Sequence, residues 1–344
     1  MDTTDTKEKK NQLSKERKMT WFILTLSCII LWGVTDILYR ASSDQNDPLS
    51  HYKTFVWIGI VMALAGLIMS TWTDTLLDSI NAIKYDLLYL IPLGFVYAFA
   101  LLLGLYGKKY LYASLTSPIE NVGGAFAVII TSFYYLLTGY IDPSYRIGAV
   151  NIIAAASVMI GIILIAKEEQ ALFKKELHLS EDKREHRHGA LVLICPIIYS
   201  LADVFSTAEI GGVSGNDGMV TSGAIDAIPA IDFYIFECVG FAFVAICIWF
   251  YMMIVKKYKY NPFDEGELIR CGAATGETFG TMTFILAAGI NPVLTAPLTY
   301  LHCLLTVILA HVFLKERLTK KQYVSLAFLA VGLILLGISG FFNA

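Results

Sequence analysis

Ten long apolar stretches constrain this chain more than any other feature of its sequence. Each has roughly 20 residues or more, the length that a helix rising 1.5 Å per residue needs to cross about 30 Å of hydrocarbon. The stretches lie at 20–42, 53–72, 85–107, 112–137, 147–167, 189–210, 229–255, 268–290, 293–314 and 321–341. They predict an all-α polytopic membrane protein with ten transmembrane helices.

The composition agrees with a chain that lies mostly in the bilayer. Of its 344 residues, 56% are hydrophobic and 16% are charged, whereas soluble domains have about 45–50% and about 25%. The net charge of −3 argues against nucleic acid as a partner. The first 18 residues are polar and of mixed charge, so we expect the first span to be retained rather than cleaved as a signal peptide.

One long charged stretch divides the spans into two sets of five. We expect a polar tail at 1–19, a first half at 20–167, a charged linker at 168–188 and a second half at 189–344. The linker carries Lys and Glu at mixed spacing, and we expect it to be a solvated amphipathic helix. Its two histidines lack a clear set of further ligands, so they are a weak indication of a metal site. A second irregular region at 211–230 is rich in Gly, Ser, Asn and Asp, which predicts a loop.

Short motifs recur between the halves. Thr116-Ser117-Pro118 matches Thr295-Ala296-Pro297 at an offset of 179, and the Asp36 motif of the first span matches the Asp203 motif of the sixth at 167. Because five crossings are an odd number, the second half must enter the membrane inverted relative to the first. An inverted repeat predicts a binding site near the membrane midplane, between the halves.

These residues resemble the drug/metabolite transporter superfamily, in its ten-helix branch of two EamA-type repeats. The resemblance rests on Leu314 to Thr319 with the glycines of the last span, on Trp32-Gly33 with Arg40, and on Tyr110 to Pro118. It covers nearly the whole chain. It implies a secondary transporter with both termini in the cytosol.

Acidic residues inside the spans need an explanation, because each costs a few kcal/mol to insert. Five lie away from the span ends: Asp36, Glu120, Asp203, Glu237 and Glu277. Asp36 and Arg40 share a helical face, and they form either an ion pair that snorkels to the interface or a pair that lines a cavity. Asp203 gains weight as the repeat partner of Asp36.

Glu277 is the strongest candidate for a functional acid. It lies within Gly272-x-x-x-Gly276-x-x-x-Gly280, a stripe that lets helices approach closely. It has threonines as its polar neighbours and no base nearby in sequence, which suits proton exchange or binding of a cation. A carboxyl group hydrogen-bonded to these threonines is the structural alternative.

The remaining candidates are weaker. Glu120 and Asn121 follow Pro118, where they either satisfy a disturbed helical turn or line the cavity. Tyr39, Tyr97 and Tyr300 are aromatic groups with a polar tip inside spans. His302 is either a packing residue or a cavity group.

We therefore predict a secondary transporter that moves a small polar or cationic metabolite or drug by alternating access, coupled to protons or to exchange. A non-transporting receptor or a membrane enzyme are the alternatives. The G-x-S-G string at 212–215 lies in the polar loop, and no nucleophile with a base is evident, so we expect no enzyme.

We predict no cofactor and no metal. The six cysteines are expected to be buried apolar residues. The expected partners are a small-molecule substrate and the lipid bilayer, with a homodimer left open. We expect a multi-pass protein of a prokaryotic plasma (inner) membrane. The basic tail favours cytosolic termini, although the connections after the odd-numbered spans hold more Lys and Arg.

Overall fold

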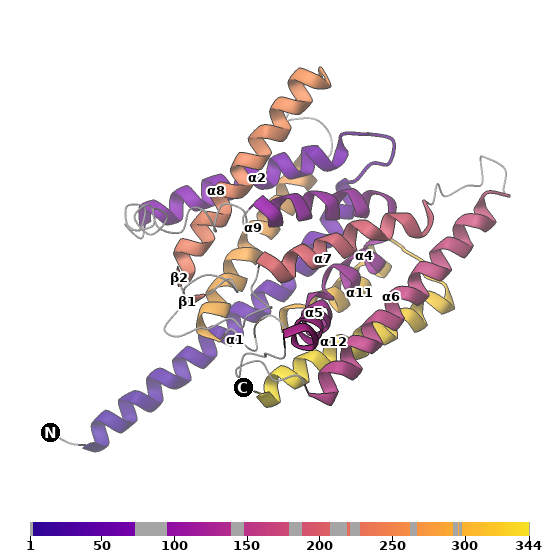
Figure 1. Ribbon diagram of the computed structural model, residues 1–344. Helices are drawn as coiled ribbons and strands as arrows, with labels where there is room; N and C mark the ends of the chain where they lie inside the picture. Colours follow the sequence, from indigo (N-terminus) through magenta and orange to yellow (C-terminus); the bar gives the residue numbers. More distant parts are fainter. Residues whose placement is uncertain are drawn as a thin grey trace.

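A computed structural model describes residues 3–72, 95–138, 148–178, 188–206, 219–220, 228–261, 267–291, 295 and 298–343. Regular structure in these residues is helical, apart from the short antiparallel pair of β1 (Met219–Val220) and β2 (Ile228–Pro229). Figure 1 shows the arrangement, with both chain ends at the lower left. Every one of the ten predicted stretches contains described helical residues.

The described elements overlap the predicted stretches. Up to residue 176 they are α1 (Thr3–Ser42), α2 (Ser50–Trp72), a helix at 95–110, α4 (Ala113–Glu120), α5 (Gly123–Thr138) and α6 (Ala149–Glu176). From residue 189 on they include the 3-10 turn η2 (Gly189–Leu193), α7 (Ile194–Ser206), α8 (Ala230–Phe250), the π-helical turn η3 (Tyr251–Val255), α9 (Glu267–Ile290), α11 (His302–Phe313) and α12 (Lys320–Asn343).

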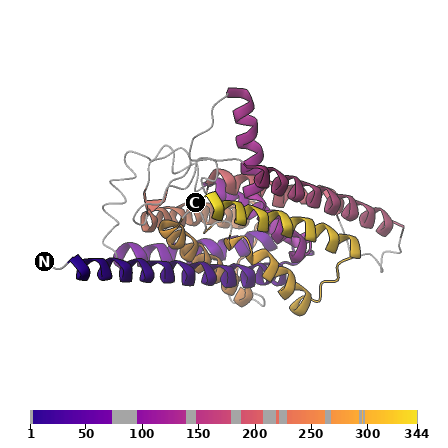
Figure 2. The same cartoon turned by 90° about the horizontal axis from the view of Figure 1, so that it is seen from below.

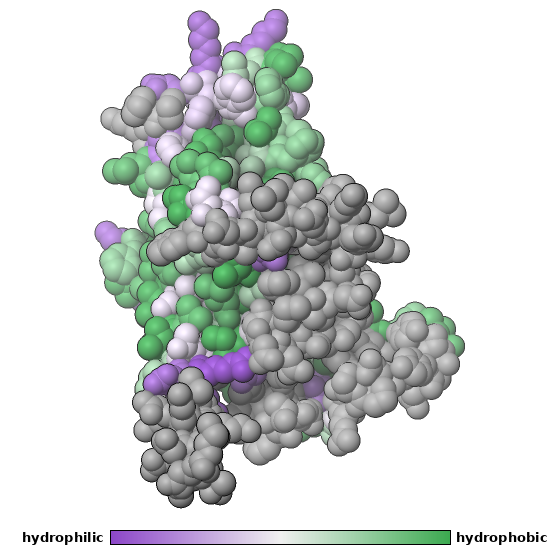
Figure 3. All heavy atoms as spheres, turned by 90° about the vertical axis from the view of Figure 1, so that its left-hand side faces the viewer, coloured by the Kyte–Doolittle hydropathy of each residue, from purple (hydrophilic) through white to green (hydrophobic). Residues whose placement is uncertain are grey.

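Within the described residues, four helices are long and apolar enough to cross a membrane. They cover Glu16–Ser42, Ser50–Thr71, Ala149–Glu176 and Ala230–Val255. Two shorter apolar helices cover Gly189–Ala202 and His302–Phe313. The space-filling view in Figure 3 shows apolar side chains along the described part of one flank, with polar ones gathered near its upper end.

One predicted stretch is interrupted, and the start of the predicted linker is helical. The stretch at 112–137 is two helices, α4 and α5, and the break at Asn121 and Val122 lies just after Pro118, which lacks an amide hydrogen. The Asn121 side chain donates to the Ser117 carbonyl at 2.7 Å, in place of a regular helical bond. The helix α6 runs on to Glu176, well into the predicted linker.

The predicted loop at 211–230 lies mostly outside the described residues. The same holds for 85–94 of the third predicted span and for most of 292–297 in the ninth.

Three long helix pairs build the bundle. The helix α1 packs along α9, α2 along α8, and α6 along α12. Figure 2, seen from below, shows α6 and α12 side by side. The glycine stripe of α9 lies at a close helix contact, as predicted, and the structure shows that the partner is α1: a Cβ on Gly276 would lie 2.1 Å from Thr35 Oγ1, and one on Gly280 would lie 2.5 Å from Trp32. The two helices therefore cross at a separation that a larger side chain would prevent.

Candidate functional site

A small cavity lies among the helices α1, 95–110, α4, α7, α9 and α11. Its volume is about 50 Å³, which is room for a few water molecules. Eight predicted site residues line it: Asp36, Tyr39, Tyr97, Glu120, Asn121, Glu277, Tyr300 and His302. Trp32, Leu101, Lys108, Tyr199, Thr281 and Phe284 complete the lining.

One side of the cavity holds a buried ion cluster centred on Lys108. The Lys108 Nζ lies 3.3 Å from Asp36 Oδ1 and contacts Glu120 Oε2 more closely still. Thr306 Oγ1 donates to the other Asp36 oxygen at 3.0 Å. One lysine thus serves two carboxylates, and both charges depend on it because all three side chains are buried.

Glu277 lies on another side of the cavity, with hydroxyl groups as its partners. Tyr39 Oη donates to Glu277 Oε2 at 3.1 Å, and Thr281 Oγ1 donates to Oε1 at 3.4 Å. Among the described residues, no basic side chain forms a salt bridge with this carboxyl group. The group is 96% buried, so its charge is not balanced by a neighbour in direct contact.

His302 is held in one tautomer by its neighbours. Its Nδ1 lies 2.8 Å from the Thr299 carbonyl, which can only accept, so Nδ1 carries the hydrogen. Its Nε2 lies 3.2 Å from Asn121 Nδ2, which donates, and 3.7 Å from Asp36 Oδ2. The contacts with Thr299 and Asn121 fit a neutral imidazole. Asn121 belongs to the helix break described above, so this break supplies a side chain to the cavity.

Aromatic rings form much of the remaining wall. Tyr97 and Tyr199 share a hydrogen bond between their hydroxyl groups at 3.0 Å. The Lys108 ammonium lies 5.8 Å from the centre of the Tyr39 ring and 6.0 Å from that of Tyr199. Trp32 packs edge-on against His302, with 5.4 Å between ring centres. Such π-faces attract cations in a site that excludes water.

Lys108 is the principal residue that the sequence analysis missed. The predicted third span ended at 107, so Lys108 fell just outside it. In the structure the helix continues to 110 and Lys108 is 2% exposed. The signal that was available is the excess of acids over bases inside the spans, since buried charges are usually paired.

Arg40 does not lie where either prediction placed it. It forms no ion pair with Asp36; its Nη1 donates to the carbonyls of Lys108 and Lys109 at 3.3 and 3.1 Å, and its Nε lies 3.9 Å from Glu316 Oε1. The guanidinium therefore caps the end of the helix at 95–110, since the last carbonyls of a helix lack partners. Asp36 finds Lys108 instead.

Two other predicted acids are not among the described residues that line the cavity. The backbone of Asp203 belongs to α7, but its side chain lies outside the described residues. Glu237 is buried on α8 and does not line the cavity. The part of the chain that the structure describes contains no group of three or more His, Cys, Asp or Glu side chains that could hold a metal ion.

Polar contacts join the two halves at the end of the bundle where α1 ends. Glu316, which follows α11, accepts from the amides of Ala113 and Ser114 at 2.9 and 3.1 Å, and from Ser114 Oγ at 2.6 Å. Nearby, Arg270 Nη2 donates to the Ser42 carbonyl at 3.2 Å. Hydrogen bonds at this end of the molecule therefore join α4 to the segment after α11, and α1 to α9.

Comparison with known proteins bears on this site. The sequence model of the EamA-like transporter family matches residues 214–338. This part of the chain is therefore similar to EamA-like transporters. The match confirms the predicted resemblance to the drug/metabolite transporter superfamily and indicates a membrane transporter of that type. No curated protein sequence matches the chain.

The solved structures extend the likeness of fold beyond that part of the chain. A crystal structure of another protein matches with a TM-score of 0.53 and covers 92% of this chain and 97% of its own. The sequences are 14% identical. The two proteins therefore share an overall fold along nearly the whole chain.

Proposed function

We propose that this protein is a secondary transporter that carries a small organic cation through the membrane and exchanges it for a proton at Glu277. The observation that carries the proposal is the difference between the cavity acids. Asp36 and Glu120 share Lys108, whereas Glu277 is held by hydroxyl groups alone. A carboxyl group buried in this way is stable as a neutral acid or with a cation beside it.

The charge of the lining favours a cation over an anion. Three carboxylates, Asp36, Glu120 and Glu277, face one lysine and a histidine whose hydrogen bonds fit the neutral form. An arriving cation would meet this acidic excess and the π-faces of the surrounding aromatic rings. When it binds, the Glu277 proton leaves to water, and the carboxylate takes the cation in its place.

The size of the cavity favours alternating access. About 50 Å³ is too little for a metabolite, and hydrogen bonds join α4 to the segment after α11 at the end near Glu316. A substrate could therefore enter only when the surrounding helices move apart, as when two halves rock around a fixed site.

The contact between α2 and α8 supports an inverted repeat. Gly59 lies against Ala245, and Gly66 lies against Cys238. Positions rise along α2 as they fall along α8, so the helices are antiparallel. Cys238 lies 179 positions after Gly59, and Ala245 lies 179 positions after Gly66. A shift of 179 therefore maps each of the two contacts onto the other, with the two helices exchanged. The same shift relates Thr116-Ser117-Pro118 to Thr295-Ala296-Pro297.

A second contact repeats the pattern between α6 and α12. Gly161 faces Leu329 and the Ser325 carbonyl, while Gly332 faces Val158 and the Ala154 carbonyl. Equivalent antiparallel helices that meet face to face are related by a two-fold axis perpendicular to them. In a bundle that spans the bilayer, that axis lies in the membrane plane, which is the geometry of an inverted-topology repeat.

The orientation remains the one predicted from the tail and the family resemblance, with both termini in the cytosol of a prokaryotic cell. A cysteine introduced at Gln170, near the end of α6, should then react with a membrane-impermeant thiol reagent on intact cells. Reaction only after lysis would reverse the orientation.

Glu277→Gln tests the exchange mechanism. The amide keeps the shape and the hydrogen bonds but removes the charge, so the protein should insert and fold. Uptake of a library of organic cations into proteoliposomes, driven by a pH gradient, should fall at least about tenfold, or about 1.4 kcal/mol in barrier height. The residual uptake should lose its dependence on pH.

Glu237→Gln is the matched control, because it removes an equally buried acid that does not line the cavity, and uptake should be retained. Unchanged uptake and an unchanged pH profile in Glu277→Gln would exclude Glu277 as the exchange site. Counterflow of labelled substrate separates a transporter from a receptor or an enzyme, since only a transporter exchanges substrate across the bilayer.

A further inference from the structure

A second, larger groove lies on the lipid-facing side of the bundle, between α8 and the helix at 95–110. Its outer part has a volume of about 540 Å³ and its inner part about 330 Å³. Tyr52, Leu102 and Tyr251 line both parts, so the groove is continuous. It is distinct from the central cavity, which none of these three residues lines.

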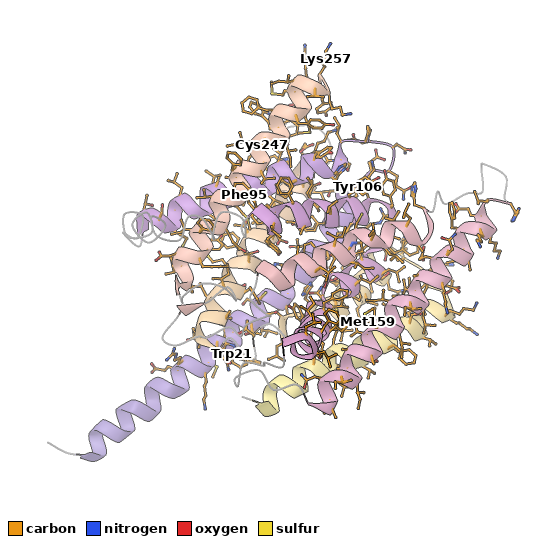
Figure 4. The ribbon with its side chains drawn as sticks, in the orientation of Figure 1. Trp21, Phe95, Tyr106, Met159, Cys247 and Lys257 are labelled. Atoms are coloured by element: carbon orange, nitrogen blue, oxygen red, sulfur yellow. The ribbon has the colours of Figure 1, made fainter. Side chains whose placement is uncertain are left out.

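The groove changes from polar to apolar along its length. Its outer part contains His51, Tyr106 and Lys256, at the ends of α2, the helix at 95–110 and η3. Its inner part is lined by Phe95, Phe99, Phe243 and Cys247, among others. Figure 4 shows Phe95 and Cys247 near one another and Lys257 just beyond the end of η3.

The length of the groove fits one leaflet of a bilayer. From Tyr106 to Phe95 is eleven residues of one helix, or about 17 Å at 1.5 Å per residue. Half of a hydrocarbon core is about 15 Å. An acyl chain that starts at the interface beside Tyr106 would therefore end beside Phe95, close to the bilayer midplane.

The outer end holds a buried histidine and an exposed lysine. His51 is 93% buried, and its Nδ1 has no hydrogen-bond partner among the described residues. Lys256 is exposed, with its ammonium 5.7 Å from the centre of the Tyr251 ring, and no salt bridge in the described part of the chain involves it. Lys257 and Lys259 follow directly. This end is therefore suited to an anion at the membrane surface.

We propose that the groove is a binding site for an anionic phospholipid, with one acyl chain between Phe95, Phe99 and Phe243 and the phosphate beside Lys256 and His51. The exposed aromatic rings Phe99 and Phe243, each 55% exposed, supply the apolar surface for the chain. The basic end selects a headgroup with net negative charge over a zwitterionic one.

Native mass spectrometry of the full-length protein released from micelles tests the headgroup preference. Phosphatidylglycerol should be retained about fivefold better than phosphatidylcholine of the same chain length, since one lysine near an anionic lipid contributes roughly that factor. Lys256→Gln should abolish the preference. Lys257→Gln, a neighbouring exposed lysine that does not line the groove, should change it less than twofold.

Cys247 provides a second, independent measurement. Cys247 is exposed, Cys271 is partly exposed and the other four cysteines are buried. The prediction that all six are buried is therefore wrong for these two. Phosphatidylglycerol should slow the reaction of Cys247 with an apolar maleimide more than phosphatidylcholine does. The control is Ile254→Cys in a Cys247→Ala background, because position 254 is exposed but lies outside the groove. The cysteine at this position should not be protected.

Three results would overturn the proposal. Equal retention of both lipids in the wild type would remove the headgroup selectivity. Equal protection at position 254 would show general coating by lipid. Oxidative cross-linking of Cys247 between two chains would show that a second copy occupies the groove.

Discussion

The two acidic sides of the central cavity differ in how their charge is balanced. Asp36 and Glu120 have a lysine of the same chain between them, whereas Glu277 has a tyrosine and a threonine. The first arrangement supplies its own counter-charge and needs nothing from outside. The second is complete only when a proton or a cation arrives. A buried carboxylate with a base beside it can therefore stabilise the fold, whereas one without a base is free to exchange a proton for a cation.

The largest effect should follow from removing the base that separates the two sides. Lys108→Met leaves Asp36 and Glu120 buried without a counter-charge, which should destabilise the protein by about 3–5 kcal/mol. Thermal unfolding in detergent, followed by a dye that reacts with newly exposed Cys28 and Cys303, measures the loss. Both thiols are buried in the folded state.

The double variant Lys108→Met with Glu120→Gln provides the control. It removes one of the two stranded charges, so it should melt at a higher temperature than Lys108→Met alone. If Lys108→Met melts like the wild type, the ion cluster is not structural and the contrast between the two sides fails.

A smaller effect is expected at the helix crossing that joins the sides, since α1 carries Asp36 and α9 carries Glu277. A methyl group on Gly276 would lie 2.1 Å from Thr35 Oγ1, so Gly276→Ala should destabilise the fold by about 1–3 kcal/mol. Gly272→Ala is the matched control, because its nearest neighbour would be Leu38 at 3.7 Å. Equal melting temperatures for the two variants would show that the crossing adjusts freely.

The smallest effect concerns an ion pair at the start of α2, between Asp47 in the connection before the helix and Lys53 in its first turn, with 2.7 Å between Lys53 Nζ and Asp47 Oδ2. Partial burial raises the pKa of Asp47, but hydrogen bonds from Lys53 and from the Leu49 amide outweigh it, so the pKa lies below the ordinary 3.8. Stability from this pair is present above pH 4 and is lost as the pH falls through the lowered pKa.

Asp47→Asn should therefore lower stability by less than about 1 kcal/mol at pH 7. The difference in melting temperature from the wild type should vanish in acid. A difference that persists below the pKa would mean that Asp47 acts through its shape rather than its charge.

Much of the cavity was predictable from the sequence because an acid inside an apolar span needs an explanation. That reasoning found Asp36, Glu120 and Glu277, and the structure places all three around one cavity. It failed for Lys108, because a lysine at the end of an apolar run has the same pattern whether it reaches the interface or folds inward. Only its contact with Asp36, 72 positions earlier in the chain, distinguishes the two.

Arg40 shows a related limit. Spacing of four residues places Asp36 and Arg40 on one helical face, but it cannot tell which neighbouring helices approach that face. In the structure Arg40 donates to the carbonyls of Lys108 and Lys109 and forms no salt bridge with Asp36. The break after α4 was only partly foreseen, because Pro118 indicates a disturbed turn without locating the interruption at Asn121.

Glu316 has a mechanical consequence. A single carboxylate after α11 fastens the start of α4 through two amides and a hydroxyl group, with Arg40 beside it. The Glu316 carboxylate accepts all three hydrogen bonds, so a movement of Glu316 away from α4 breaks them together. Separation of the two elements at this end is therefore a threshold event, and the protein should spend little time half open.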